Sequence, residues 1–134
     1  MVLLLGRGES TWGTSMISIV DDEECVREAV RGLVRSFGFD AYAFSSAETF
    51  LKSSRLSDTA CVITDIQMPG MSGMELQDVL IAQDRPVPII FMTTFPDERI
   101  RQRVLNAGAV GFLVKPFSDG CLINCMKTAQ RIID

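Results

Sequence analysis

The chain has 134 residues, of which 47% are hydrophobic and 22% are charged, and its net charge is -4. These values predict one folded domain with a single core, and they exclude general disorder. They give no reason to expect that this domain contacts nucleic acid. No apolar run approaches the roughly 20 residues that a membrane helix needs, so we expect no membrane contact and a cytoplasmic location.

The cysteines and the lack of histidine limit the possible chemistry. Cys25, Cys61, Cys121 and Cys125 form no C-x-x-C pair, and the chain contains no histidine. This composition disfavours a zinc site, and we expect buried or half-buried free thiols. Any histidine-based chemistry must come from a partner molecule.

The first segment, "MVLLLGRGESTWGT" (1–14), differs from the rest of the chain. It has little periodicity and several turn-forming residues, which predicts a disordered extension or a leader outside the fold. The folded domain is therefore expected over residues 15–134.

From Ser15 onward, short apolar runs alternate with segments of helical periodicity. The apolar runs predict strands over 16–20, 41–44, 60–64, 88–93 and 110–114. Helices are predicted between Val26 and Phe37, around Ala47–Leu51 behind a Ser45 or Ser46 cap, over 73–83, from an Asp97 cap to Asn106, and over 118–133. This alternation predicts an α/β fold: a doubly wound, five-stranded parallel sheet flanked by five helices.

Polar residues stand where several of these strands end. Asp21 and Asp22 follow the first strand, Asp65 follows the third, Thr93 ends the fourth, and Lys115 follows the fifth. Ligands of such sheets bind beyond the carboxyl ends of the strands, where the winding direction reverses. We therefore expect these five residues to meet at one edge of the sheet.

The chemistry of this group favours phosphoryl transfer. Three carboxylates repel one another unless a cation neutralises them, and Mg²⁺ binds carboxylates while leaving room for phosphate oxygens. Lys115 and Thr93 would add an ammonium group and a hydroxyl for the phosphoryl oxygens. Asp65 is the expected nucleophile, forming an acyl phosphate, because it lies between the acidic pair and the Thr/Lys side.

Four motifs resemble the receiver domain of two-component response regulators, in the CheY-like superfamily. They are "VDDE" (20–23), "DIQMPGMSGMEL" (65–76), "IIFMTT" (89–94) and "FLVKPF" (112–117), and they occur in the family's order and at suitable intervals. The last two motifs are most similar to FixJ-type regulators, whose output domains bind DNA. The resemblance implies the flavodoxin-like receiver fold.

The resemblance also implies roles for individual residues. Asp65 would accept a phosphoryl group from a sensor histidine kinase. Asp21, Asp22 and Asp65 would hold Mg²⁺ or Mn²⁺, together with the backbone carbonyl of Gln67. Beyond self-catalysed phosphotransfer and autodephosphorylation, no enzymatic activity is implied.

Three further residues would form the switch of such a domain. Lys115 would contact the phosphoryl group, Thr93 would turn inward to it, and the rotamer of Phe112 would follow Thr93. The surface of helix four, strand five and helix five would then change and control a transcriptional output, and it is a candidate surface for homodimerisation. The family also has a cis bond at the position of Lys115-Pro116.

Two departures from the family pattern adjoin the expected site. Thr94 stands where the family has a small residue, and Phe95-Pro96 replaces a polar, glycine-containing loop. We expect Thr94 and Phe95, with Gln67, to modulate solvent access to phosphorylated Asp65.

Three alternative functions remain open from the sequence. A phosphatase with an aspartyl intermediate would need a second aspartate at position 67, where this chain has Gln67. A flavodoxin-like nucleotide or flavin binder would need a Gly, Ser or Thr loop where this chain has "DDEE" (21–24). A degenerate receiver would act as a constitutive interaction module.

Overall fold

The computed structural model describes residues 16–133 apart from residue 86, so the expected extension over 1–14 lies outside the described residues. The elements run in the order β2 (Met16–Val20), α2 (Glu24–Ser36), β3 (Asp40–Phe44), α3 (Ala47–Lys52), the 3₁₀ helix η1 (Leu56–Asp58), β4 (Thr59–Asp65), α4 (Gly73–Ala82), β5 (Ile89–Thr93), α5 (Glu98–Asn106), β6 (Gly111–Val114) and α6 (Asp119–Ile133). Among the described residues, no helix has the length and apolarity required to cross a bilayer.

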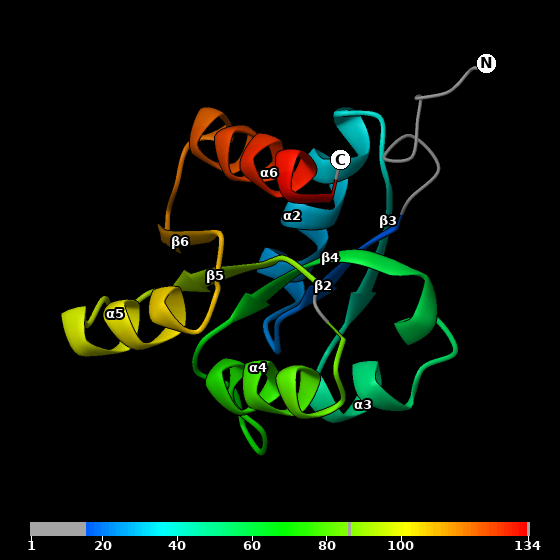
Figure 1. Ribbon diagram of the computed structural model, residues 1–134. Helices are drawn as coiled ribbons and strands as arrows, with labels where there is room; N and C mark the ends of the chain where they lie inside the picture. Colours follow the sequence, from blue (N-terminus) through cyan, green and yellow to red (C-terminus); the bar gives the residue numbers. More distant parts are fainter. Residues whose placement is uncertain (1–15, 86, 134) are drawn as a thin grey trace.

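The five strands form one parallel sheet in the order β3-β2-β4-β5-β6. Helices α2 and α6 cover one face, and α3, α4 and α5 cover the other (Figure 1). The winding reverses between β2 and β4, because β3 lies on one side of β2 and the later strands lie on the other. This arrangement confirms the predicted doubly wound fold, and the carboxyl ends of β2 and β4 flank the reversal.

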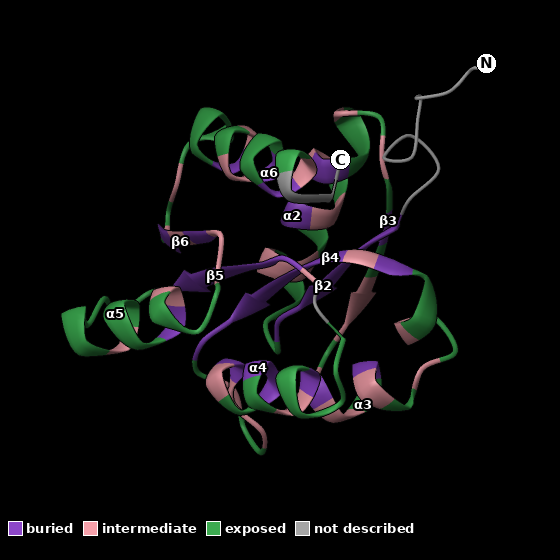
Figure 2. Ribbon diagram, viewed as in Figure 1, coloured by how far each residue is buried: buried purple, intermediate pink, exposed green. Residues whose placement is uncertain are grey.

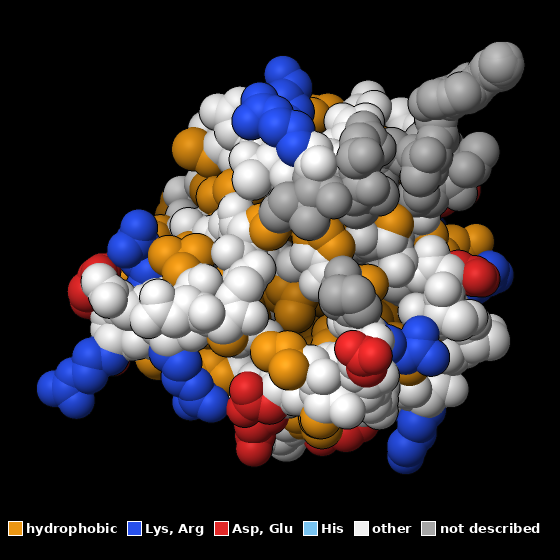
Figure 3. Space-filling view, in the orientation of Figure 1, with side chains coloured by type: hydrophobic (Ala, Val, Ile, Leu, Met, Phe, Trp, Pro, Cys, Tyr) orange, Lys and Arg blue, Asp and Glu red, His pale blue; other side chains and the backbone are white. Residues whose placement is uncertain are grey.

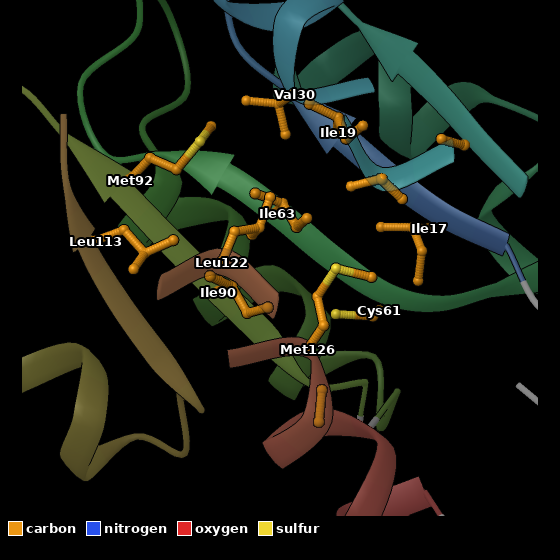
Figure 4. Close-up of a cluster of buried hydrophobic side chains, with 13 residues drawn as sticks. Ile17, Ile19, Val30, Cys61, Ile63, Ile90, Met92, Leu113, Leu122 and Met126 are labelled. Atoms are coloured by element: carbon orange, nitrogen blue, oxygen red, sulfur yellow. The ribbon is translucent and has the colours of Figure 1, made fainter. Parts of the chain in front are cut away.

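The core has two parts, one on each side of the sheet. Ile17, Ile19 and Ile63 face α2 and α6, where they pack with residues such as Leu122 and Met126 (Figure 4). Successive strand residues point to opposite faces, and helices cover both faces, so the central strands are almost wholly buried and mostly apolar (Figure 2). Burying each such large apolar side chain contributes about 1.5–3 kcal/mol to folding.

Local signals set the ends of the helices. Ser46 caps α3, and Asp97 accepts hydrogen bonds from backbone N–H groups at the start of α5, as predicted. Ser72 and Glu75 form a capping box at the start of α4. Gly38 follows α2 with φ +98°, a conformation that glycine adopts without a steric penalty.

Two expectations from the sequence need correction. Asp65 does not follow the third strand but ends it, because it pairs in register with Met92 of β5. Cys25 and Cys121 are exposed rather than buried, because they lie on solvent-facing sides of α2 and α6.

Candidate functional site

Three carboxylates meet at the carboxyl edge of the sheet. Asp21 follows β2 and is fully buried, Asp65 ends β4 and is 6% exposed, and Asp22 is exposed. One oxygen atom from each lies within 4.8 Å of the others. Two carboxylates of the cluster are therefore buried and the third faces solvent.

Lys115 brings a positive charge into this cluster from the end of β6. Its Nζ lies 2.9 Å from Asp21 Oδ2 and 3.2 Å from Asp65 Oδ2, and 3.7 Å from Glu23 Oε1. Its backbone N–H donates to the carbonyl of Thr93 at 2.8 Å, and the bond that follows, Lys115-Pro116, is cis. The ammonium group thus bridges the two buried carboxylates.

The environment shifts the pKa of both Asp65 and Lys115. Burial raises the pKa of Asp65 and the charge of Asp21 adds to this effect, against the opposing influence of Lys115 and the Gln67 backbone N–H. Burial acts to lower the pKa of Lys115, but contacts with Asp21 and Asp65 outweigh it and raise the pKa. Lys115 is therefore charged at neutral pH, and one ammonium group does not fully compensate the buried carboxylates.

Asp65→Asn should therefore raise the thermal unfolding midpoint of the metal-free protein at neutral pH. A carboxyl group whose pKa is raised by folding opposes folding at pH values above that pKa, and this penalty is relieved as the pH falls through it. The gain should shrink as the pH is lowered. Calorimetry of both proteins from neutral to acidic pH, with a chelator present, measures it; a gain that is constant with pH would contradict the electrostatic cause.

Backbone contacts fix the loop that carries the acidic pair. The Asp21 N–H donates to the carbonyl of Phe44 at 3.1 Å, and Asp21 Oδ1 accepts from the N–H of Glu23 at 2.8 Å. Arg27 of α2 donates from Nη1 to the Asp21 carbonyl at 2.9 Å. Glu23 and Arg27 are site residues that were not predicted; their only signal in the sequence is their position shortly after "DD" (21–22).

Gly73 lets helix α4 start directly against Asp65. Its N–H donates to the carbonyl of Ile66 at 2.8 Å, and a Cβ at this position would overlap the Asp65 carbonyl oxygen. The glycine in "MSGMEL" is therefore required for close approach of the helix to the strand end.

Gly73→Ala should lower the free energy of unfolding by about 2 kcal/mol, because the helix start or the strand end must move. Urea unfolding measures this change. Gly32→Ala is the matched control, because a Cβ at Gly32 meets nothing within 4 Å. Equal stability of the two variants would contradict the steric explanation.

The remaining predicted residues lie around the same edge. Thr93 is 2% exposed, and its hydroxyl donates to the Phe95 carbonyl at 3.2 Å and accepts from the Phe95 N–H at 3.1 Å. Phe112 of β6 is half-buried and pairs in register with Phe91. The hydroxyl of Thr93 thus bonds to its own loop in this structure. Two other predicted modulators, Gln67 and Thr94, are exposed.

An open groove of about 810 Å³ adjoins the carboxylates, between α2 and the segment after β6. Lys115, Glu23 and Thr94 line its end near the site, and Leu33 and Phe117 are among its apolar lining residues. The groove gives a large molecule a path to the edge of the sheet.

The strand order and the polar edge together place the chain in the flavodoxin-like α/β fold class. Comparison of the sequence with protein families agrees, since the family described as "Response regulator receiver domain" matches residues 17–127. The chain belongs to the response regulator receiver domain family.

Individual relatives and solved structures are similar over most of the chain. Response regulator protein TmoT of Ectopseudomonas mendocina is 38% identical over 128 residues, which cover 96% of this chain and 58% of TmoT. Transcriptional regulatory protein FixJ of Bradyrhizobium diazoefficiens is 36% identical over 115 residues, or 86% of this chain and 56% of FixJ. The chain thus spans somewhat more than half the length of these relatives.

Two solved structures show the same fold. The structure of response regulator StyR superposes with a TM-score of 0.82 at 39% identity, covering 89% of this chain and 60% of StyR. The FixJ-N structure gives a TM-score of 0.78 at 34% identity, covering 87% of this chain and 94% of FixJ-N. Two-component signalling is therefore the process to which the domain belongs.

Proposed function

We propose that this receiver domain, over residues 15–134, is controlled by phosphorylation of Asp65. The observation that carries the proposal is the Lys115 ammonium group, which bridges Asp21 and Asp65 beside Asp22. A carboxylate oxygen of Asp65 would form a bond to phosphorus while the P–N bond of a phosphohistidine breaks, and the departing imidazole would retain the bond's electron pair and take up a proton. We propose that the phosphohistidine belongs to a sensor histidine kinase, since these 134 residues include no histidine.

The donor set fits a divalent ion that prefers oxygen. Asp21, Asp22 and Asp65, with the backbone carbonyl of Gln67, would hold Mg²⁺ or Mn²⁺. When bound, the ion supplies positive charge that stabilises the oxygens of a transferring phosphoryl group. The Lys115 ammonium would hold another phosphoryl oxygen, and the groove beside it would admit the kinase.

Phosphorylation would act through Thr93 and the surface of α5, β6 and α6. A phosphoryl oxygen would draw the Thr93 hydroxyl from the Phe95 backbone, and Phe112 would fill the space that it leaves. Val114 of β6 is 43% exposed and Phe95, in the loop before α5, is 68% exposed; arginine side chains project from the α5 side, at the left of Figure 3. The change is a population shift between two arrangements of a surface suited to homodimerisation.

The output is proposed from the relatives, which are longer than this chain and include a transcriptional regulatory protein. We propose that a further domain contacts DNA and that this domain does not, acting in the cytoplasm where the kinase would present its phosphohistidine. The domain would catalyse only its own phosphotransfer and dephosphorylation. The side chain of Gln67 cannot act as a general acid, which disfavours the phosphatase alternative.

The proposal is tested by incubating the protein with acetyl phosphate or phosphoramidate and Mg²⁺, followed by intact mass measurement. We expect the mass to increase by one phosphoryl group, and we expect no increase when a chelator is present during the incubation. A protein that neither gains this mass nor binds beryllofluoride would instead be a constitutive interaction module.

Thr94→Ala should shorten the lifetime of the phosphorylated state. Thr94 is exposed and lines the groove beside Lys115, so its removal should open a path for water to Asp65. The decay of the phosphorylated mass after removal of the phosphodonor measures the lifetime. Thr128→Ala on α6 is a control of the same chemistry away from the groove, and equal lifetimes for Thr94→Ala and wild type would reject the idea.

A further inference from the structure

The loop between Asp65 and α4 is fixed at its two ends. The Ile66 N–H donates to the carbonyl of Met92 at 2.9 Å, and the Gly73 N–H returns to the carbonyl of Ile66 at 2.8 Å. Between these bonds, Gln67, Pro69 and Gly70 are exposed. The position of the Gln67 carbonyl therefore depends on what holds the exposed part of the loop.

Glu48 of α3 contacts this part of the loop from outside the site. Its Oε2 accepts a hydrogen bond from the Met71 N–H at 2.9 Å, between residues that are 23 positions apart. This bond is the largest of the effects that lower the pKa of Glu48, so the side chain is charged at neutral pH. A charged acceptor makes the bond stronger than one between neutral groups.

Gly70 packs against the same carboxylate. Its φ is +76°, and a Cβ at this position would lie 2.6 Å from Glu48 Oε2. The loop therefore turns sharply against the Glu48 side chain, and both the turn and the Met71 N–H depend on its position.

Helix α3 holds Glu48 firmly in place. Ser46 caps the helix by accepting from the Thr49 N–H at 3.0 Å, and Ala47 and Phe50 are fully buried on either side of Glu48. Glu48 itself is half-buried, and its carboxylate bonds to the loop. A fixed helix thus presents a fixed acceptor to the loop, whose Met68 and Met71 side chains also pack against the core and whose Gln67 N–H contacts Asp65.

We infer that Glu48 is a positioning residue for the metal site, holding the 67–71 loop so that the Gln67 carbonyl faces the carboxylates. This inference rests on the proposed function, because it assumes that Gln67 is a ligand. Glu48 does not touch the phosphoryl group or the metal. Its loss should therefore weaken metal binding without changing the chemistry once the metal is bound.

The test compares Glu48→Ala with Glu48→Gln, which loses the charge but keeps an acceptor oxygen. By calorimetric titration with Mg²⁺, Glu48→Ala should raise the Kd about tenfold, as outer-shell substitutions do, and Glu48→Gln should raise it much less. The rate with acetyl phosphate should fall at limiting Mg²⁺ and recover at saturating Mg²⁺. In metal-free protein, hydrogen exchange at the Met71 amide should accelerate in Glu48→Ala. Glu28→Ala on α2 removes the same charge far from the loop in sequence and should leave all three readouts unchanged.

Several results would overturn the inference. An unchanged Kd in Glu48→Ala, with or without faster exchange at Met71, would show that Glu48 does not position the site. Equal weakening by all three substitutions would assign the effect to charge alone. Glu48→Asp, with its shorter reach, replaces Glu48→Ala in the same comparison if the alanine variant does not fold. A wild-type protein that binds no Mg²⁺ would instead reject the proposed function itself.

Discussion

Asp65→Asn is expected to abolish the phosphoryl mass gain that acetyl phosphate and Mg²⁺ produce in the wild-type protein. The amide that replaces the carboxylate is a poor nucleophile and a weaker metal ligand, so both requirements of the reaction are lost. Intact mass measurement at equal protein and Mg²⁺ concentrations detects the difference. The mass gain should be lost completely rather than partly, because no other side chain replaces Asp65 as the nucleophile.

Asp58→Asn is the matched control for this substitution. Asp58 lies in η1, at the opposite end of β4 from Asp65, and it is exposed. Its replacement should leave the mass gain unchanged. If Asp65→Asn still gained the mass, the nucleophile would be another group, and Asp21 and Asp22 would be the next to test.

Lys115→Met is expected to lower the free energy of unfolding of the metal-free protein by about 3 kcal/mol at neutral pH. The substitution keeps much of the side-chain volume but leaves the buried carboxylates of Asp21 and Asp65 without their shared cation. Urea unfolding with a chelator present measures the change. Lys127→Met on the exposed side of α6 is the control and should have little effect.

Two further measurements separate the lost charge from the lost packing. Without Lys115 the pKa of Asp65 should rise further, so the deficit should be full above that pKa and shrink as the pH falls through it. In an Asp65→Asn background, Lys115→Met should lower the stability less, because Asp21 is then the only buried carboxylate of the site that loses its partner. If the loss of stability in Lys115→Met depends neither on pH nor on the presence of Asp65, its cause is lost packing.

The sequence could predict the sheet and its polar edge because both follow from local patterns. Strands such as β2 and β5 are mostly apolar because helices cover both faces of the sheet and bury every residue in them, and Asp21 and Asp65 stand where such runs end. The winding rule for parallel sheets then predicts that Asp21 and Asp65 meet Lys115, although they precede it by 94 and 50 positions in the sequence.

The details of side-chain pairing could not be predicted in the same way. The Thr93 hydroxyl bonds to the Phe95 backbone, Arg27 reaches the Asp21 carbonyl, and Glu48 reaches the Met71 N–H. Each contact depends on the rotamer of a side chain and on the exact path of a loop. Neither leaves a periodic signal in the sequence, and each residue alone looks like an ordinary surface or strand residue.

The ammonium group of Lys115 also means that the resting domain carries its own counterion. A divalent ion entering the site meets carboxylates that are already partly neutralised, so it competes with a tethered cation that cannot diffuse away. The free energy of metal binding is therefore the difference between the carboxylate contacts with the metal and the carboxylate contacts with Lys115 that they replace. We therefore expect reversible metal binding of modest affinity, with the occupancy of the site following the ion concentration around it.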